Sequence, residues 1–208
     1  MKLGVLGGTF DPPHVGHLIL AEEARTRLQL EKVLFVPAGD PWRKAGQEIT
    51  PIDHRLAMVR LMLASDPYFE LCTLEVERAG PSYTVDTLEA LHERHGPGLE
   101  LYFIVGEDAL RDLPHWKDPA RILSLAWLAV APRLGGSESA VVDLEAAVPG
   151  FAERIVPLPM PAIDISSTAL RERARAGLSL RHLVPLAVEE YIRRHGLYVG
   201  NQEPGTRN

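Results

Sequence analysis

The sequence predicts an α/β fold, in which helices cover both faces of a mostly parallel β-sheet. Six short apolar runs of strand length recur along the chain, and most of the stretches between them carry apolar residues at helical spacing. Strands that alternate with helices favour a parallel sheet, because each crossover helix returns the chain to the edge where the previous strand began. Ligands of such sheets bind beyond the carboxyl ends of the strands, so we expect the functional residues there.

The expected strands are the apolar runs at residues 3–6, 33–36, 69–72, 101–105, 125–131 and 155–158. The expected helices lie at residues 18–28, 52–64, 84–95, 141–148, 168–176 and 185–195. Pro51 suits the start of a helix, and Gly96-Pro97 suits an end. For the helix at 168–176, Ser166 or Ser167 is a suitable N-cap and Gly177 a suitable end.

The length and the charge of the chain limit its function. Its 208 residues suffice for one domain, which we expect to span residues 1–199, followed by a polar, disordered tail at 200–208. The net charge of −6 argues against a nucleic-acid partner, since attraction to a phosphate backbone needs an excess of Lys and Arg on one face. A small anionic substrate needs only a local basic pocket. The candidates for that pocket are Arg43, Lys44, Arg133 and Arg171.

Cysteine content and hydropathy predict a soluble, cytoplasmic protein without a membrane partner. Cys72 is the single cysteine, which excludes an intramolecular disulfide and a cysteine-rich zinc site. No apolar run approaches the length of a membrane span, and Met1-Lys2 leads directly into an expected strand rather than into a signal peptide. The sequence leaves open whether copies of the chain form a homo-oligomer.

The segment Gly7-Gly8-Thr9-Phe10-Asp11-Pro12-Pro13-His14-Val15-Gly16-His17 follows the first expected strand and predicts a phosphate site on a glycine turn. Glycines let backbone N–H groups approach an anion, and a helix that opens near His14 or Gly16 adds its positive end. The segment has neither the Gly-Lys-Ser/Thr of a Walker loop nor the three-glycine spacing of a dinucleotide fingerprint. Both histidines can face one ligand if this part is helical. The alternatives are a metal held by Asp11 and both histidines, and histidines that only cap a loop.

Several ordered stretches resemble one enzyme family, over about residues 2–198. His14-Val15-Gly16-His17 resembles the H-x-G-H signature of the nucleotidyltransferase superfamily, and Ile165-Ser166-Ser167-Thr168-Ala169-Leu170-Arg171 resembles its second signature, I-S-S-T-x-x-R. Pro81-Ser82-Tyr83-Thr84-Val85-Asp86-Thr87-Leu88 resembles a segment typical of bacterial nicotinate-nucleotide adenylyltransferases. Residues 103–108 with Trp116, and residues 191–198, are also similar to that family.

The resemblance implies a Rossmann-like fold of the nucleotidyltransferase type and a specific reaction. AMP would pass from ATP to nicotinate mononucleotide by direct in-line attack without a covalent enzyme intermediate, giving deamido-NAD⁺ and pyrophosphate. Mg²⁺ would accompany ATP, and we assign no protein side chain as a ligand of this ion. The catalytic residues implied are His14, His17, Lys44 and Arg171. The residues implied at ATP are Gly7, Gly8, Thr9, Phe10, His14, His17, Gly106, Asp108, Ile165, Ser166, Ser167, Thr168 and Arg171.

The chemistry of adenylyl transfer is compatible with these residues. Negative charge develops on phosphate oxygens, where imidazole N–H groups and the Arg171 guanidinium can stabilise it. A phosphate monoester acceptor has a second pKa of about 6, so it needs no strong general base. Trp42 and Arg43 stand where the family usually has Pro and His before Lys44, so Arg43 receives no role. For Arg171 taken alone, a surface arginine on a capped helix is the alternative.

The nicotinate end of the site follows from the resemblance. Trp116 would stack on the pyridine ring, and backbone amides near Thr84 and Lys117 would bind its carboxylate, which favours the acid over the amide. Trp116 could instead be a core aromatic, Tyr83 could fill the core, and Asp108 could cap a helix. Leu134 replaces the proline that usually follows the family's arginine at position 133. The residues implied at nicotinate mononucleotide are Lys44, Tyr83, Thr84, Trp116, Lys117 and Arg133.

Three other functions remain open at this point. Phosphopantetheine adenylyltransferases share both signatures, but they are usually shorter and lack the segment around Tyr83-Thr84. Nicotinamide mononucleotide is another candidate acceptor. A non-catalytic nucleotide sensor would keep the fold and bind its ligand without turnover.

Overall fold

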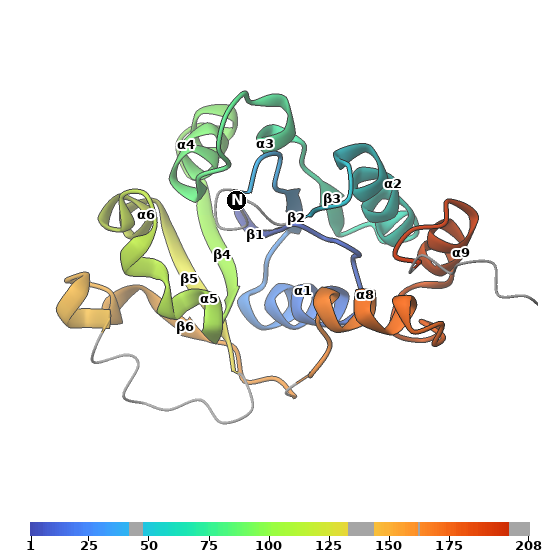
Figure 1. Ribbon diagram of the computed structural model, residues 1–208. Helices are drawn as coiled ribbons and strands as arrows, with labels where there is room; N and C mark the ends of the chain where they lie inside the picture. Colours follow the sequence, from blue (N-terminus) through green and yellow to red (C-terminus); the bar gives the residue numbers. More distant parts are fainter. Residues whose placement is uncertain (42–47, 133–143, 162, 200–208) are drawn as a thin grey trace, which may run out of the picture.

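The computed structural model describes residues 1–41, 48–132, 144–161 and 163–199. At its centre lies a six-stranded sheet in the order β3-β2-β1-β4-β5-β6, in which every pairing is parallel (Figure 1). The strands are β1 (Lys2–Gly8), β2 (Lys32–Pro37), β3 (Phe69–Leu71), β4 (Glu100–Gly106), β5 (Ala126–Ala131) and β6 (Ile155–Pro157). The predicted α/β class with a parallel sheet is confirmed.

Successive side chains of the strands enter two different cores. In β1, Leu3 and Val5 belong to one hydrophobic cluster and Leu6 to the other, and in β4 Phe103 and Ile104 divide in the same way. Because neighbouring strand residues point to opposite faces, a strand covered on both sides buries every side chain. This explains why continuous apolar runs, rather than apolar–polar alternation, mark these strands in the sequence.

Helices cover both faces of the sheet (Figure 1). One cluster packs under α1 (Val15–Leu28), α2 (Ile52–Leu63), α8 (Ser167–Arg175) and α9 (Leu186–Arg194). The other packs under α3 (Leu74–Glu77), α4 (Thr84–His95), α5 (Glu107–Arg111) and α6 (Pro119–Leu125). A 3₁₀ turn, η2 (Leu113–His115), follows α5, and another, η3 (Ala152–Arg154), precedes β6. Within the described ranges, none of the helices has the length and apolar composition that a bilayer crossing requires.

Several short helices were not predicted, because segments of about two turns or fewer show no clear period. They are α3, α5, α6 and η2. Leu125, expected to open a strand, instead ends α6, whose N-cap Asp118 accepts a hydrogen bond from the backbone N–H of Arg121 at 3.0 Å. Cys72 and Leu158 lie just past the strands expected to contain them. Of the helix expected at 141–148, the structure describes helical residues at 144–147, and the predicted tail lies outside the described residues.

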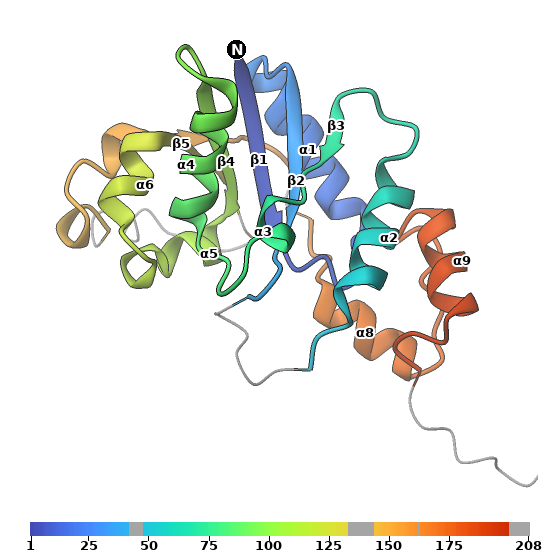
Figure 2. The same ribbon diagram turned by 90° about the horizontal axis from the view of Figure 1, so that it is seen from above.

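The strand order determines where a ligand can bind. β1 pairs with β2 on one side and with β4 on the other, and Figure 2 shows these three strands at the centre of the molecule. The order of the strands reverses between β1 and β4, so the connections that leave these two strands run in opposite directions. In open α/β sheets a crevice forms at this topological switch point, beyond the carboxyl ends of the strands. The loops that follow Gly8 and Gly106 border that crevice.

Candidate active site

A cleft of about 580 Å³ lies at the carboxyl ends of β1 and β4. We call it the central cleft, and its lining comes from both faces of the sheet. The residues implied at ATP that line it are Gly7, Gly8, Thr9, Phe10, His17, Gly106 and Ser167. The residues implied at nicotinate mononucleotide that line it are Thr84 and Trp116. Segments far apart in the sequence therefore contribute to one cleft, as expected from the strand pattern.

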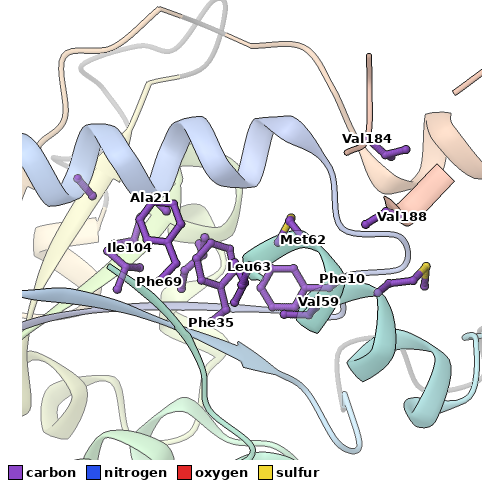
Figure 3. Packing of buried hydrophobic residues seen from close by; sticks show 14 of the residues in the cluster. Phe10, Ala21, Phe35, Val59, Met62, Leu63, Phe69, Ile104, Val184 and Val188 are labelled. Carbon is purple, nitrogen blue, oxygen red and sulfur yellow. The ribbon is translucent and has the colours of Figure 1, made fainter. Parts of the chain in front are cut away.

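The turn after β1 depends on Phe10 rather than on the glycines. Gly7 and Gly8 still pair with Val36 and Pro37 of β2, and the positive φ of the turn, 50°, falls at Phe10. The side chain of Phe10 is 1% exposed and lies in the cluster below α1 (Figure 3). Burial of the ring therefore holds a backbone conformation that phenylalanine rarely adopts. The expected glycine turn is corrected: the two glycines end the strand, where they add no side chain to the wall of the cleft.

The two histidines meet at the start of α1, which begins at Val15, near the expected helix opening and ahead of the apolar spacing at residues 18–28. Their rings are stacked, with centroids 3.6 Å apart and an angle of 25° between the planes. The Nδ1 atom of His17 accepts a hydrogen bond from the backbone N–H of His14 at 3.1 Å. Nδ1 therefore carries no proton, and a neutral His17 ring has its N–H donor at Nε2. Gly16 allows this stacking, because a Cβ there would lie 3.0 Å from Nδ1 of His14.

Burial keeps both imidazoles neutral. It lowers the pKa of His14 to about 4. Burial and the adjacent His14 ring lower the pKa of His17 well below its ordinary value, since two stacked cations would repel each other. Nδ1 of His14 is buried and has no hydrogen-bond partner within the described part of the chain. The pair can therefore act at neutral pH as uncharged N–H donors.

We expect the buried His14 to make the protein less stable in acid. The unfolded chain binds a proton at His14 near the ordinary pKa of 6.5, whereas the folded chain binds it only near pH 4. Between these values the unfolded state holds more protons, so the free energy of unfolding falls as the pH falls. The contribution of His14 is complete above pH 6.5 and amounts to roughly 3 kcal/mol.

Urea unfolding of the wild type and of His14→Gln at about pH 7.5 and about pH 4.5 measures this contribution. The stability of the wild type relative to His14→Gln should decrease by roughly 2–3 kcal/mol between the two conditions. The comparison cancels the titrating groups that do not contact His14, because they are common to both chains. His17 is the exception, since the His14 ring contributes to lowering its pKa. A relative stability that does not change with pH would show that His14 is not held neutral by burial.

The first turn of α8 contacts the loop between β1 and α1. Of the two expected N-cap residues, Ser166 caps this helix, because its Oγ accepts a hydrogen bond from the N–H of Ala169 at 3.2 Å. The hydroxyl of the next residue, Ser167, donates to the backbone carbonyl of Pro12 at 2.8 Å. The N-terminus of α8 therefore lies at the edge of the central cleft. The loop that it holds, residues 9–14, is called the histidine loop below.

Arg171 contacts the same loop one helical turn later. Its Nη1 donates to the backbone carbonyl of Asp11 at 2.7 Å, although the two residues are 160 positions apart in the sequence. Nη2 donates to the hydroxyl of Thr168 at 3.3 Å. A guanidinium has five N–H donors, so further donors remain for an anion. The two signatures thus meet beside the cleft, with Arg171 bonded to the loop that leads to His14 and His17.

A buried arginine that was not predicted supports the histidine loop from α2. Arg55 is 2% exposed, and its Nη1 donates to the backbone carbonyls of Thr9 and Ala38, both at 2.9 Å. Its Nε donates to the carbonyl of Thr50 at 2.9 Å. Thr9 and Ala38 directly follow β1 and β2, so Arg55 connects the loops that leave these two neighbouring strands. The sequence could have indicated that Arg55 is buried, because it lies on the apolar face of α2, one turn before Val59.

Asp11 is a second buried polar group in the loop. Its Oδ1 accepts a hydrogen bond from the hydroxyl of Tyr198 at 2.6 Å, and its Oδ2 accepts one from the backbone N–H of Thr50 at 3.2 Å. Both oxygens are therefore engaged within the protein. Across the described residues, no group of three His, Cys, Asp or Glu side chains could hold a metal ion. The hydrogen bonds of Asp11 therefore go to groups of the protein, which does not favour the alternative of a metal held by Asp11 and both histidines.

The other side of the central cleft has an aromatic surface and a helix N-terminus. Trp116 is half-buried and meets the ring of Phe103 edge to face, with centroids 5.8 Å apart. Thr84 opens the twelve-residue helix α4, whose first N–H groups have no partners within the helix. The ammonium of Lys117 lies 2.8 Å from a carboxylate oxygen of Asp86 and 4.7 Å from the ring centre of Tyr83.

A buried carboxyl group in the cleft wall was also not predicted. Oε1 of Glu75 accepts a hydrogen bond from the hydroxyl of Thr87 at 2.7 Å. Burial raises the pKa of Glu75, and hydrogen bonds from Thr87 and Ser82 oppose that rise. Ser82 in turn accepts hydrogen bonds from the N–H groups of Gly39 and Asp40 at 3.0 and 3.2 Å. The network joins the loop after β2 to the start of α4, and nothing in the sequence marks Glu75 as its member.

Of the remaining expected residues, some lie in the described part of the chain and others lie outside it. Gly106 is the N-cap of α5, so the alternative that Asp108 caps this helix is wrong; Asp108 lies in its first turn. Ile165 is half-buried and packs against the cluster under α1. Lys44 and Arg133, with Arg43, lie outside the described residues, and their roles stay predictions.

Sequence comparison finds close relatives over nearly the whole chain. Residues 5–173 match a family described as cytidylyltransferase-like. A probable nicotinate-nucleotide adenylyltransferase of Thermomicrobium roseum is 49% identical, with 95% of this chain and 91% of the relative covered. A protein with the same description from Dehalococcoides mccartyi is 45% identical, with 95% and 97% covered.

Structure comparison finds the same architecture at much lower identity. The Plasmodium falciparum nicotinic acid mononucleotide adenylyltransferase complexed with NaAD has a TM-score of 0.78 and 18% identity, with 95% of this chain and 97% of that chain covered. The same protein complexed with APC has a TM-score of 0.76. At this identity, the likeness supports the fold and not the individual residues.

Proposed function

Since the chain belongs to the cytidylyltransferase-like family, and to the nicotinate-nucleotide adenylyltransferases within it, we propose that it transfers AMP from ATP to nicotinate mononucleotide. The products are deamido-NAD⁺ and pyrophosphate, which places the enzyme in NAD biosynthesis. The observation that carries the proposal is the lining of the central cleft. His17 and Ser167 offer phosphate ligands from one face of the sheet, and Trp116 and Thr84 offer an aromatic and carboxylate site from the other.

The reaction is a direct displacement at the α-phosphorus of ATP. A phosphate oxygen of nicotinate mononucleotide forms a bond to that phosphorus, and the bond to the oxygen that bridges to the β-phosphate breaks. Pyrophosphate leaves with the electron pair. The attacking monoester is largely ionised at neutral pH, since its second pKa is about 6. No strong general base and no covalent enzyme intermediate are therefore required.

The protein stabilises the charge that develops on the phosphate oxygens. The Nε2–H of His17 is the donor left by the bond at Nδ1, and a preorganised donor in a buried site strengthens as charge develops. Arg171 and the N-terminus of α8 hold the β- and γ-phosphates through the guanidinium, Ser167, Thr168 and backbone amides. His14 and Lys44 complete the set of residues proposed to contact the triphosphate.

The acceptor binds at the opposite side of the cleft. The pyridine ring of nicotinate stacks on Trp116, because an electron-poor ring favours a flat aromatic partner. Its carboxylate accepts hydrogen bonds from backbone amides near Thr84 and Lys117. The ammonium of Lys117 contributes little, since it is paired with Asp86 at 2.8 Å. A carboxamide presents N–H donors of its own to these amides, which explains a preference for the acid.

Mg²⁺ enters with ATP in this proposal. It would be held mainly by phosphate oxygens and water, because this ion retains most of its water and needs few protein ligands. The described residues contain no three-ligand metal cluster, and both oxygens of Asp11 are engaged. We therefore assign no side chain to the ion. The ion neutralises phosphate charge when it is bound.

The proposal is tested by steady-state turnover of the full chain with ATP and Mg²⁺. Nicotinate mononucleotide, nicotinamide mononucleotide and phosphopantetheine are supplied in separate reactions, and pyrophosphate and the adenylylated product are measured. We expect kcat/KM to be at least about 10²-fold higher for the nicotinate compound, because the amide opposes the backbone donors. Equal or better turnover of another acceptor would overturn the substrate assignment, and ATP binding without pyrophosphate release would identify a sensor.

The proposed setting follows from composition. We place the enzyme in the cytoplasm, since a chain with a single cysteine cannot form the intramolecular disulfides that are typical of oxidising compartments. With a net charge of −6, the proposed partners are ATP and nicotinate mononucleotide rather than a nucleic acid.

A further inference from the structure

We propose that Tyr198 is a positioning residue for this reaction, which acts through Asp11 on the histidine loop. The inference rests on the proposed function and assigns a task to a residue that lies outside the two signature motifs, H-x-G-H and I-S-S-T-x-x-R. The match to the family model ends at residue 173. Residues 174–199, which we call the C-terminal segment, follow that point and contain Tyr198.

The hydroxyl of Tyr198 reaches a residue 187 positions earlier in the sequence. It donates to Oδ1 of Asp11 at 2.6 Å, and Asp11 is only 2% exposed. Burial and the bond to Asp11 raise the pKa of Tyr198 above its ordinary value, so the hydroxyl keeps the proton that it donates. A buried carboxyl oxygen that loses its donor is costly, and its side chain then moves toward another donor or toward water.

Asp11 transmits this restraint to the groups proposed to bind the triphosphate. Its backbone carbonyl accepts from Nη1 of Arg171 at 2.7 Å, and its Oδ2 accepts from the N–H of Thr50 at 3.2 Å. Asp11 lies three positions before His14, in the same loop. A shift of Asp11 therefore displaces both a proposed phosphate ligand on α8 and the imidazole pair at the start of α1.

The C-terminal segment is itself firmly anchored. The backbone carbonyl of Leu183 accepts a hydrogen bond from the N–H of Val15, the first residue of α1, at 3.0 Å. Val184 and Val188 belong to the same hydrophobic cluster as Phe10, and Figure 3 shows them at the same end of that cluster. The segment thus contacts the chain on both sides of His14, at Asp11 through Tyr198 and at Val15 through Leu183. It provides a rigid support for the histidines.

Loss of the hydroxyl should affect the chemical step more than substrate binding. Misplacement of a catalytic donor by a fraction of an ångström weakens a contact that matters most in the transition state, whereas ground-state binding tolerates it. We expect Tyr198→Phe to lower kcat by roughly 10-fold, with the KM of ATP and of nicotinate mononucleotide changed by less than about threefold.

Tyr191→Phe is the matched control. The hydroxyl of Tyr191 lies 2.9 Å from Nδ1 of His54, so this variant also removes a hydrogen-bonded hydroxyl from the C-terminal segment. Its partner lies on α2 and not in the histidine loop. We expect a comparable loss of melting temperature and an unchanged kcat. If both variants lose kcat equally, or neither does, the positioning role is wrong.

Two further measurements separate positioning from loss of folding and from failure of the proposed function. The nitrogen-15 resonances of the His14 and His17 rings in the ligand-free protein should shift in Tyr198→Phe and not in Tyr191→Phe. This readout needs no turnover, so it tests the inference even if the wild type does not make deamido-NAD⁺. Asp11→Asn combined with Tyr198→Phe should lose no more kcat than the more damaging single change, because both act through one contact. Independent, multiplied losses would overturn the proposal.

Discussion

The His17→Ala variant is expected to turn over about 10²–10³-fold more slowly than the wild type, in line with the loss of one preorganised donor to a developing oxyanion. His17 lines the central cleft, and the hydrogen bond at its Nδ1 leaves Nε2–H as the donor. That donor gains strength as charge develops on the phosphate, so kcat should fall much more than the affinity for ATP. Steady-state kinetics and a separate ATP-binding titration measure the two effects.

The control for this variant is His95→Ala. His95 is exposed at the end of α4 and lies near Met1 and Leu3, at the opposite edge of the sheet from the central cleft. Its removal should leave kcat unchanged. Circular dichroism should show that His17→Ala keeps its secondary structure, because the neighbouring Phe10 remains in the core. Turnover of folded His17→Ala within about threefold of the wild type would refute the role of this imidazole.

The sequence could predict the architecture because the sheet is buried on both faces. Leu3, Val5 and Leu6 all enter one of the two cores. Each strand of such a sheet is therefore a continuous apolar run, which can be recognised in the sequence. Short helices such as α5 and α6 escaped prediction, because so few turns give no period. The end of α6 at Leu125 shows the same limit, since an apolar helix end and an apolar strand run into each other without a break.

The candidate site was predictable where chemistry needs particular side chains at fixed spacing. His14 and His17 satisfy this condition, and so does Arg171, because their types and positions form signatures. Arg55 and Tyr198 do not, since what they hold are backbone carbonyls and a carboxylate brought near only by folding. Phe10 illustrates a third case: its positive φ depends on burial of the ring in a core made by distant residues.

Replacing Arg171 with alanine is expected to lower kcat/KM for ATP by about 10²-fold, the effect of losing charge-assisted hydrogen bonds in a partly buried site. Two functions are lost together. The proposed contacts to the β- and γ-phosphates disappear, which raises KM for ATP. The bond from Nη1 to the carbonyl of Asp11 at 2.7 Å also disappears, which loosens the histidine loop and lowers kcat. Steady-state kinetics with ATP varied at saturating nicotinate mononucleotide separates the two losses.

Three variants divide the effect between phosphate binding and loop positioning. Arg175→Ala removes an exposed arginine one turn later on the same helix and should behave as the wild type, which controls for net charge. Arg171→Lys keeps the charge but not the planar fork, so it should recover part of the ATP affinity and little of kcat. Tyr198→Phe loosens the loop but keeps the Arg171 guanidinium, so it should lower kcat with little change in the KM of ATP. An Arg171→Ala variant whose KM for ATP equals that of the wild type would remove Arg171 from the phosphate site and leave it the loop contact only.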